Sequence, residues 1–321
     1  ETLTNRLVSG NGPDVFRFHN AWVPMFKEYL APIPQDILSK EEFEQTFYKV
    51  VLEDLKVGNA YVGVPLEIDT LALFINEKDF TAIGASPPKT WNDLRSTARQ
   101  LTVKDKDGKI QKGGVALGTF GNVDHASDIV VLMMLQAGVD LKNKKITTST
   151  SRDGRVLAED VLSYYVNEFA KGDGKVWDDT LDPSTLAFAK EKLSMYFGYS
   201  WRVFELKQLN PQLSFRVVPV PQLPEEENVA LASYWVEGVS KKSRFQKEAF
   251  TLLAYLSERE TMEKLFSEQS KLRLFGEPYS RVDMADSLKS NQYLAPFIEQ
   301  AKYASSWYAA SNTYDNGLND Q

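Results

Sequence analysis

Segments of strand type alternate with helical segments along most of this chain, and this alternation constrains the fold more than any other feature. Runs rich in apolar and β-branched residues predict strands at 60–65, 70–76, 113–119, 192–197, 215–221 and 231–240. Apolar residues spaced three and four apart predict helices at 39–55, 87–101, 125–137, 153–171 and 243–260. Strands that alternate with helices indicate an α/β fold with mainly parallel sheets.

Two of these helices carry recognisable starting residues. Ser39 and Glu42 have the spacing of a capping box. Thr90 is expected to cap the next helix, and its buried stripe should consist of Trp91, Leu94, Ala98 and Leu101.

The bulk composition excludes several classes of protein. The 321 residues are enough for two domains. The 37 basic and 44 acidic residues give a net charge of −7 without any basic run, so a nucleic-acid partner is not expected. The absence of cysteine excludes disulfides, thiolate nucleophiles and cysteine-based metal sites. The longest apolar run, 129–135, is too short to cross a bilayer.

Six segments resemble a known family in their sequence, order and spacing. They are GNGPDVFRFHNAW (10–22), YVGVPLEIDTLALFINEKDF (61–80), PPKTWNDL (87–94), LSMYFGYSW (193–201), VVPVPQLP (217–224) and YWVEGVSKKS (234–243). Together they resemble the family 1 extracellular solute-binding proteins of ABC importers, of the maltose-binding-protein-like carbohydrate type. This resemblance implies a type II periplasmic-binding-protein fold, in which crossing hinge strands join two α/β lobes and the ligand cleft lies between the lobes.

The resemblance also implies discontinuous lobes. Residues 1–67 and 219–276 are expected to form lobe 1, and residues 68–218 and 277–321 are expected to form lobe 2. The family's first strand–helix–strand unit and its C-terminal helices have no counterpart in these 321 residues, so we expect lobe 1 to be incomplete here.

The strand at 231–240 carries the main candidates for ligand binding. Sugars present flat C–H faces that pack on aromatic rings, and their hydroxyl groups need fixed donors and acceptors. Side chains alternate along a strand, so Trp235 and Glu237 share a face while Tyr234 points the other way. In the family, an aromatic residue at the position of Trp235 faces the ligand. The alternative is that Trp235 packs as core beneath the following helix.

The other candidates come from the resemblance alone. Asp69 matches a ligand-binding carboxylate of the family, although it could instead stabilise the hinge. Trp307 matches a tryptophan that stacks on sugar. Relatives place a ligand-contacting tryptophan near 199–201, which leaves the choice open among Tyr199, Ser200 and Trp201. Asn20 and Trp22 follow the GPDV segment, where relatives place a polar group and an aromatic residue in the cleft.

The function implied by the resemblance is capture of a solute by lobe closure and its delivery to the membrane permease of an ABC transporter. The number of aromatic candidates favours an oligosaccharide. We expect an extracellular or periplasmic monomer, anchored to the membrane through a segment absent from this sequence. Alternatives are a binding protein for a non-sugar solute and a sensor co-receptor.

Catalysis is not expected from this sequence. No pair of carboxylates stands out as in a glycosidase, and neither a G-x-S-x-G nor an H-E-x-x-H motif occurs. His19 and His125 lack metal-ligand spacing and are expected to act as ordinary hydrogen-bonding residues. We therefore expect neither a metal nor another cofactor, and a glycoside-active enzyme is the least favoured reading.

Overall fold

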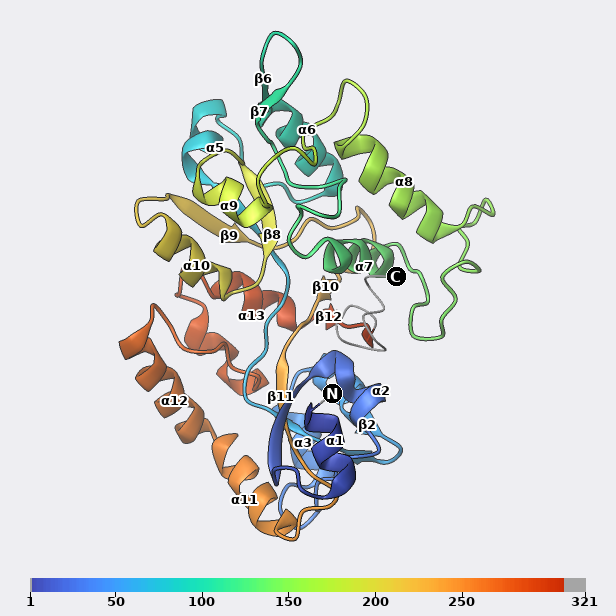
Figure 1. Ribbon diagram of the computed structural model, residues 1–321, viewed down its shortest axis with the longest axis vertical. Coiled ribbons are helices and arrows are strands. Elements are labelled where there is room, and N and C mark those ends of the chain that lie inside the picture. The colour runs from blue at the N-terminus through green and yellow to red at the C-terminus, as the bar shows by residue number, and fades with distance from the viewer. Residues whose placement is uncertain (1, 309–321) are drawn as a thin grey trace. The chain divides into compact units, whose positions relative to one another are not determined.

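The computed structural model describes residues 2–308, and the chain separates into two compact units (Figure 1). Unit 1 comprises Glu1–Thr70, Ala232–Ser290 and Ala301–Gln321. Unit 2 comprises Leu71–Leu231 and Asn291–Gln300. The chain therefore passes between the units four times, so neither unit is built from one continuous segment.

Unit 1 combines short N-terminal helices with a small sheet. Its elements in chain order are α1 (Thr2–Ser9), β1 (Val15–His19), η1 (Asn20–Trp22), α2 (Val23–Phe26), α3 (Lys40–Thr46), α4 (Lys49–Asp54), β2 (Lys56–Val57), β3 (Ala60–Tyr61), β4 (Val64–Pro65), β11 (Trp235–Val239), α11 (Gln246–Leu256), α12 (Arg259–Leu272), η2 (Val282–Leu288) and β12 (Ala304–Ser305).

The main sheet of unit 1 has the strand order β1–β11–β4, and β11 runs antiparallel to both neighbours. Phe18 on β1 lies opposite Val236 on β11, and both are fully buried. A Cβ atom at Gly238 would lie 2.5 Å from Leu30 and 2.7 Å from the ring of Phe18, so any larger residue there would displace these two buried side chains. Helix α11 packs against β11 and continues into α12 (Figure 1).

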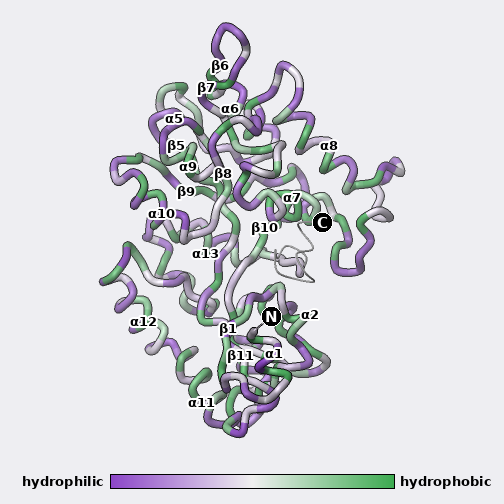
Figure 2. The backbone as a smooth tube through the Cα atoms, viewed as in Figure 1, coloured by the Kyte–Doolittle hydropathy of each residue, from purple (hydrophilic) through white to green (hydrophobic). Residues whose placement is uncertain are grey.

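Unit 2 contains the longer helices together with a second small sheet. Its elements are β5 (Ala72–Asn76), α5 (Glu77–Ile83), α6 (Trp91–Leu101), β6 (Val103–Lys104), β7 (Ile110–Lys112), α7 (Ala126–Gln136), α8 (Leu157–Phe169), α9 (Ser184–Ala189), β8 (Met195–Gly198), α10 (Arg202–Leu209), β9 (Phe215–Val218), β10 (Ala230–Leu231) and most of α13 (Ala295–Ala301). Figure 2 shows α7 as an apolar segment, whereas the β6–β7 hairpin is hydrophilic.

The prediction of mainly parallel sheets is wrong for the two three-stranded sheets. In unit 2 the strand order is β8–β5–β9, and β5 is antiparallel to both neighbours. Strands β8 and β9 do run parallel to each other and are joined through α10, as in a βαβ unit. Strand β5 arrives directly from unit 1 at Leu71 and not through a crossover helix, so its direction is not set by the βαβ connection.

Local signals predict helix α6 correctly. Thr90 forms a capping box with Asp93, in which each side chain accepts a hydrogen bond from the backbone N–H of the other residue. The buried side of the helix is the predicted stripe of Trp91, Leu94, Ala98 and Leu101.

Two other segments differ from their predicted elements. The helix predicted at 39–55 is interrupted, because Phe47 takes an extended conformation (φ −104°, ψ 159°) and forms a β-bridge with Arg281. Ser39 nevertheless caps α3 as predicted. The segment 113–119 is not a regular strand, and its only β-bridge in the described part of the chain joins Gly113 to Leu193.

The borders of the units also differ from the predicted lobes. Residues 219–231, predicted in lobe 1, belong to unit 2. The side-chain amide of Gln136 on α7 holds this segment by donating hydrogen bonds to the carbonyl oxygens of Pro221 and Val229.

Residues 68–70, 277–290 and 301–308, predicted in lobe 2, belong to unit 1. The hydroxyl of Ser280 donates to the carbonyl oxygen of Pro65 at 2.7 Å. These segments therefore belong to unit 1 because of their contacts with it. No local sequence pattern predicts such contacts.

No helix within residues 2–308 is both long enough and apolar enough to span a membrane.

Candidate functional site

Two tryptophans of unit 1 lie close together near the end of the main sheet. Trp235 begins β11 and is 41% exposed, whereas Val236, the next residue, is fully buried. Trp22 ends η1, and its ring meets that of Trp235 edge-on, with centroids 5.4 Å apart. We call Trp22 and Trp235 the indole pair. This exposure disfavours the alternative that Trp235 packs as core beneath the following helix.

The pairing of β1 with β11 brings the indole pair together. His19, the last residue of β1, lies opposite Trp235, and their rings are 5.4 Å apart. The chain then turns into η1, which places Trp22 beside both rings. One ring nitrogen of His19 caps this turn by accepting from the N–H of Ala21, and the other lies 2.9 Å from the hydroxyl of Ser233. His19 is therefore a hydrogen-bonding residue, as predicted.

Asp54, at the end of α4, accepts hydrogen bonds from three side chains of unit 1. Its carboxylate accepts from the amide of Asn20 at 2.9 Å and from the hydroxyl of Tyr234 at 2.8 Å. It also accepts from the hydroxyl of Ser306. We call these four residues the acceptor cluster. Burial, followed by the nearby Asp54 charge, raises the pKa of Tyr234 well above its ordinary value, so the phenol stays a donor.

Two of the predicted site residues therefore act inside the unit. Asn20 is 3% exposed and Tyr234 is 1% exposed. The carbonyl oxygen of the Asn20 side chain accepts from the backbone N–H of Tyr234 at 3.2 Å, which ties η1 to the start of β11. In this structure both side chains hold Asp54 and support the strand that carries Trp235.

Replacing Asp54 with alanine should lower the free energy of unfolding by about 2–3 kcal/mol, because three partly buried donors lose their acceptor. Urea unfolding followed by tryptophan fluorescence measures this change. The matched control is Glu53→Ala on the same helix, whose carboxylate lies 3.7 Å from the exposed ammonium of Lys49. The control should change stability by no more than about 0.5 kcal/mol. Equal losses in the two variants would contradict the role of the cluster.

Two acidic residues are associated with β11: Glu67, which accepts a hydrogen bond from its backbone, and Glu237, which belongs to the strand. Glu67 is 7% exposed, and its Oε1 accepts the backbone N–H of Trp235 at 2.8 Å. Glu237, predicted to share the face of Trp235, is paired with Arg17 at 2.6 Å. Its carboxylate is therefore already engaged by a cation in this structure.

The remaining candidates of unit 1 are Asp69 and Trp307. Asp69 is 4% exposed, and its side chain accepts from the N–H of Thr70 at 2.9 Å. Trp307 follows Ser306 of the acceptor cluster, so it is held in the same part of the unit. Within residues 2–308 its buried indole nitrogen has no hydrogen-bond partner.

In unit 2 the predicted aromatic residues lie in the turn between β8 and α10. Tyr199 is 3% exposed and donates its hydroxyl to Asp128 at 3.0 Å, and Ser200 is also buried. Trp201 is 45% exposed, and the guanidinium of Arg202 lies 4.2 Å from its ring centroid. Of the three residues left open by the sequence, Trp201 alone offers an exposed aromatic face.

A charged network supports Trp201 from α7 and α10. The ring of His125 packs edge-on against Tyr199 and Trp201, with centroids 4.9 Å and 5.6 Å away. The guanidinium of Arg202 lies 3.3 Å from His125 Nε2 and 3.7 Å from Asp124. Burial alone would raise the pKa of Asp124, but hydrogen bonds from Thr185 and the charge of Arg202 keep it below its usual value.

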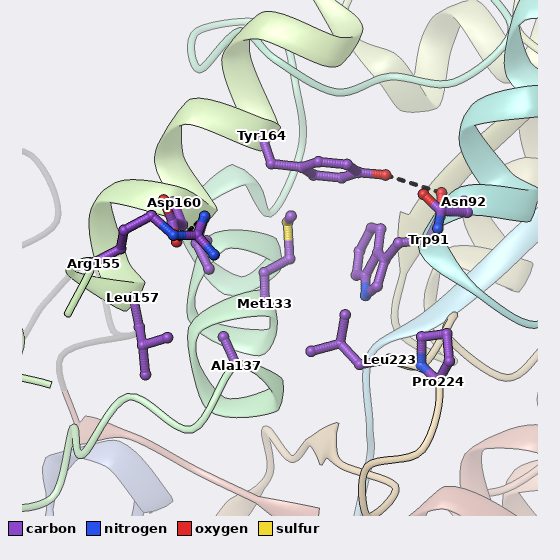
Figure 3. Close-up of a pocket in the computed structure, with 11 residues that line it drawn as sticks. Trp91, Asn92, Met133, Ala137, Arg155, Leu157, Asp160, Tyr164, Leu223 and Pro224 are labelled. Carbon is purple, nitrogen blue, oxygen red and sulfur yellow. Dashed lines mark hydrogen bonds and ion pairs between the residues drawn. The ribbon is translucent and has the colours of Figure 1, made fainter. Parts of the chain in front are cut away.

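A separate pocket of about 540 Å³ lies in unit 2 among α6, α7 and α8 (Figure 3). Trp91 and Tyr164 form aromatic walls, and an ion pair of 3.0 Å between Arg155 and Asp160 lies toward one end. The indole nitrogen of Trp91 donates to Gln136 at 2.6 Å, which agrees with its predicted role as core. The nine predicted site residues all lie in the described part of the chain, and none of them lines this pocket.

The sequence model of the bacterial extracellular solute-binding proteins matches residues 1–273. The chain belongs to this family. A binding protein of Brucella abortus (strain 2308) is 21% identical over 276 residues, which are 85% of this chain. Those residues are 65% of the relative's length, so this solute-binding protein spans less than two thirds of that relative.

Solved structures show the same fold at low identity. A solute-binding protein of an ABC transporter from Thermotoga lettingae TMO, bound with α-D-tagatose, has a TM-score of 0.69 at 19% identity. The match covers 96% of this chain and 79% of that one. A cyclic α-maltosyl-1,6-maltose binding protein from Arthrobacter globiformis has a TM-score of 0.70 at 17% identity and covers 95% and 76%, respectively. The predicted periplasmic-binding-protein fold is confirmed.

Sequence reasoning missed several residues that organise the two aromatic sites. Asp54 and Ser306 are two members of the acceptor cluster that were not predicted. Arg202 and Asp124 support Trp201. A partial signal existed for Arg202, which directly follows Trp201 in the sequence. Nothing in its local sequence distinguishes Asp54 from the other acids of the chain.

Proposed function

We propose that this solute-binding protein captures a carbohydrate outside the cytoplasm and delivers it to the membrane permease of an ABC importer. The observation that carries the proposal is the indole pair, two rings at a right angle of which Trp235 is 41% exposed. An exposed indole face suits the C–H face of a sugar ring. Both ring nitrogens of His19 are engaged within the protein, so the hydroxyl of Ser233 is the hydrogen-bonding group that we propose for a sugar hydroxyl beside this ring.

An oligosaccharide is the favoured ligand class. Trp22 and Trp235 of the indole pair supply two aromatic surfaces within unit 1, and each sugar ring uses its own surface. The structural relatives include proteins for a monosaccharide and for an oligosaccharide: one is bound with tagatose, and another binds a cyclic maltosyl-maltose.

We propose two roles for the nine predicted residues. We propose direct stacking for Trp22, Trp201 and Trp235. The others are proposed to bind hydroxyls or to hold the site in place: Asn20, Asp69, Tyr199, Tyr234, Glu237 and Trp307. The closure of two lobes on the ligand stays a prediction.

A thermal-shift screen tests the ligand class. Maltotetraose, mannobiose and tagatose are compared with glycine, glutamate and dialanine at equal concentrations. A bound sugar at about 100 times its Kd should raise the melting temperature by roughly 4 °C, because only the folded protein binds it. A shift with amino acids or the peptide, and none across a wider glycan panel, would contradict the carbohydrate proposal while leaving the family assignment intact.

We further propose that the protein binds its ligand without catalysing a reaction. We also propose that it acts as a monomer attached to the membrane. Prolonged incubation with the bound glycan should leave it unchanged by chromatography. Cleavage products that disappear in a site variant would instead indicate a glycosidase.

A further inference from the structure

A cavity of about 380 Å³ lies in unit 1 between the main sheet and the helices α11 and α12. Leu253, Met262, Phe266 and Tyr279 form its apolar walls. Its volume lies at the lower end of the range for small-molecule sites, so it suits a compact ligand. Because it is also lined by three glutamates, we call it the acidic cavity.

The three glutamates that line the acidic cavity differ in their partners. It is lined by Glu67, Glu237 and Glu277 but by a single basic residue, Arg17. Arg17 forms an ion pair with Glu237 at 2.6 Å, and Glu277 forms an ion pair with Arg273 at 2.7 Å. Among the residues that the structure describes, Glu67 makes no ion pair.

Glu67 is also incompletely hydrogen-bonded. It is 7% exposed, and Oε1 accepts the N–H of Trp235. Within residues 2–308, its second oxygen has no hydrogen-bond partner. Since it has no donor from the described part of the protein, this oxygen can accept a hydrogen bond from a ligand in the cavity.

We propose that the acidic cavity binds a small organic ammonium ion, with its charged group at Glu67 and its alkyl chain against the apolar walls. An ammonium group supplies a counter-charge for the ionised form of Glu67 and up to three N–H donors. Apolar walls favour an organic cation over a hydrated metal ion. This inference goes beyond the proposed function and does not depend on carbohydrate binding.

The other charged groups near Glu67 do not remove the need for a cation. Glu277 and Asp69 add negative charge, whereas the attraction of Arg17 is shared with Glu237. The residues of α11 that line the cavity are leucines. Burial keeps Glu67 protonated at neutral pH without a ligand, since its pKa is raised to about 8. Binding of the cation must therefore release a proton.

Calorimetry with n-butylammonium chloride as the probe tests the proposal. The wild-type protein should bind it at least about tenfold more tightly than Glu67→Gln, which keeps an acceptor for the N–H of Trp235 but cannot ionise. The control Glu248→Gln removes an exposed carboxylate from α11 and should bind like the wild type. Wild-type affinity should rise by up to about tenfold per pH unit between about pH 6 and pH 8.

A second readout uses the wild-type protein alone, so it does not depend on the folding of a variant. In methionine-methyl NMR the probe should shift the signal of Met262, which lines the cavity, and leave that of Met133 in unit 2 unchanged. Equal affinity in wild type and Glu67→Gln, equal binding of n-butanol, a response to sodium or magnesium chloride alone, or an unshifted Met262 would each overturn the proposal.

Discussion

Replacing Trp235 with alanine is expected to weaken saccharide binding by on the order of 30- to 150-fold while leaving the fold intact. Stacking of a sugar ring on this indole buries apolar surface of both partners, and its loss should cost about 2–3 kcal/mol of binding energy. The fold should survive because the indole is 41% exposed, whereas the neighbouring Val236 is fully buried in the core.

The matched control for this experiment is Phe245→Ala. Phe245 is 59% exposed and precedes α11 in the same unit, outside the indole pair. Calorimetry with the strongest glycan of the thermal-shift screen measures affinity, and circular dichroism with urea unfolding confirms folding. Unchanged affinity in Trp235→Ala, or an equal loss in the control, would contradict the role of the indole pair.

The second large effect concerns the pH dependence of stability. Burial, followed by the negative charge of Glu277, raises the pKa of Glu67 from 4.5 to about 8, although the N–H of Trp235 and the charge of Arg17 act in the opposite direction. Between these two values the folded protein holds a proton that the unfolded chain has released. The contribution of Glu67 to stability is therefore complete below about pH 4.5 and is lost as the pH rises to about 8. Its full size is on the order of 5 kcal/mol.

Glu67→Gln should remove this dependence. Urea unfolding of wild type and variant at about pH 5, 6.5 and 8 should give a stability difference that shifts progressively in favour of the variant as pH rises. Taking the difference cancels groups that titrate equally in both proteins. The free energy of unfolding of Glu248→Gln, a change on the surface of α11, should depend on pH in the same way as that of the wild type. Parallel curves for Glu67→Gln would show that Glu67 is ionised in the folded protein.

The candidate site was predictable only where its residues are close in sequence or follow a strand pattern. Alternation along the strand predicts that Tyr234 points away from the face of Trp235, and Tyr234 is 1% exposed where Trp235 is 41% exposed. The same alternation groups Glu237 with Trp235 but cannot reveal that Arg17, 220 residues away in the sequence, engages Glu237. A strand pattern describes side-chain direction and carries no information about the partner that faces it.

The sequence by itself determined the family, through six ordered segments, and the local structure at positions such as Thr90, whose capping partner Asp93 is three residues away. Tertiary structure alone decided the direction of β5 and the environment of Asp54. The three donors to Asp54 come from residues 34, 180 and 252 positions away. The physical reason is the range of the interactions. Caps and side-chain alternation depend on a few neighbouring residues, whereas the donors around a carboxylate depend on which distant segments the folded chain brings together.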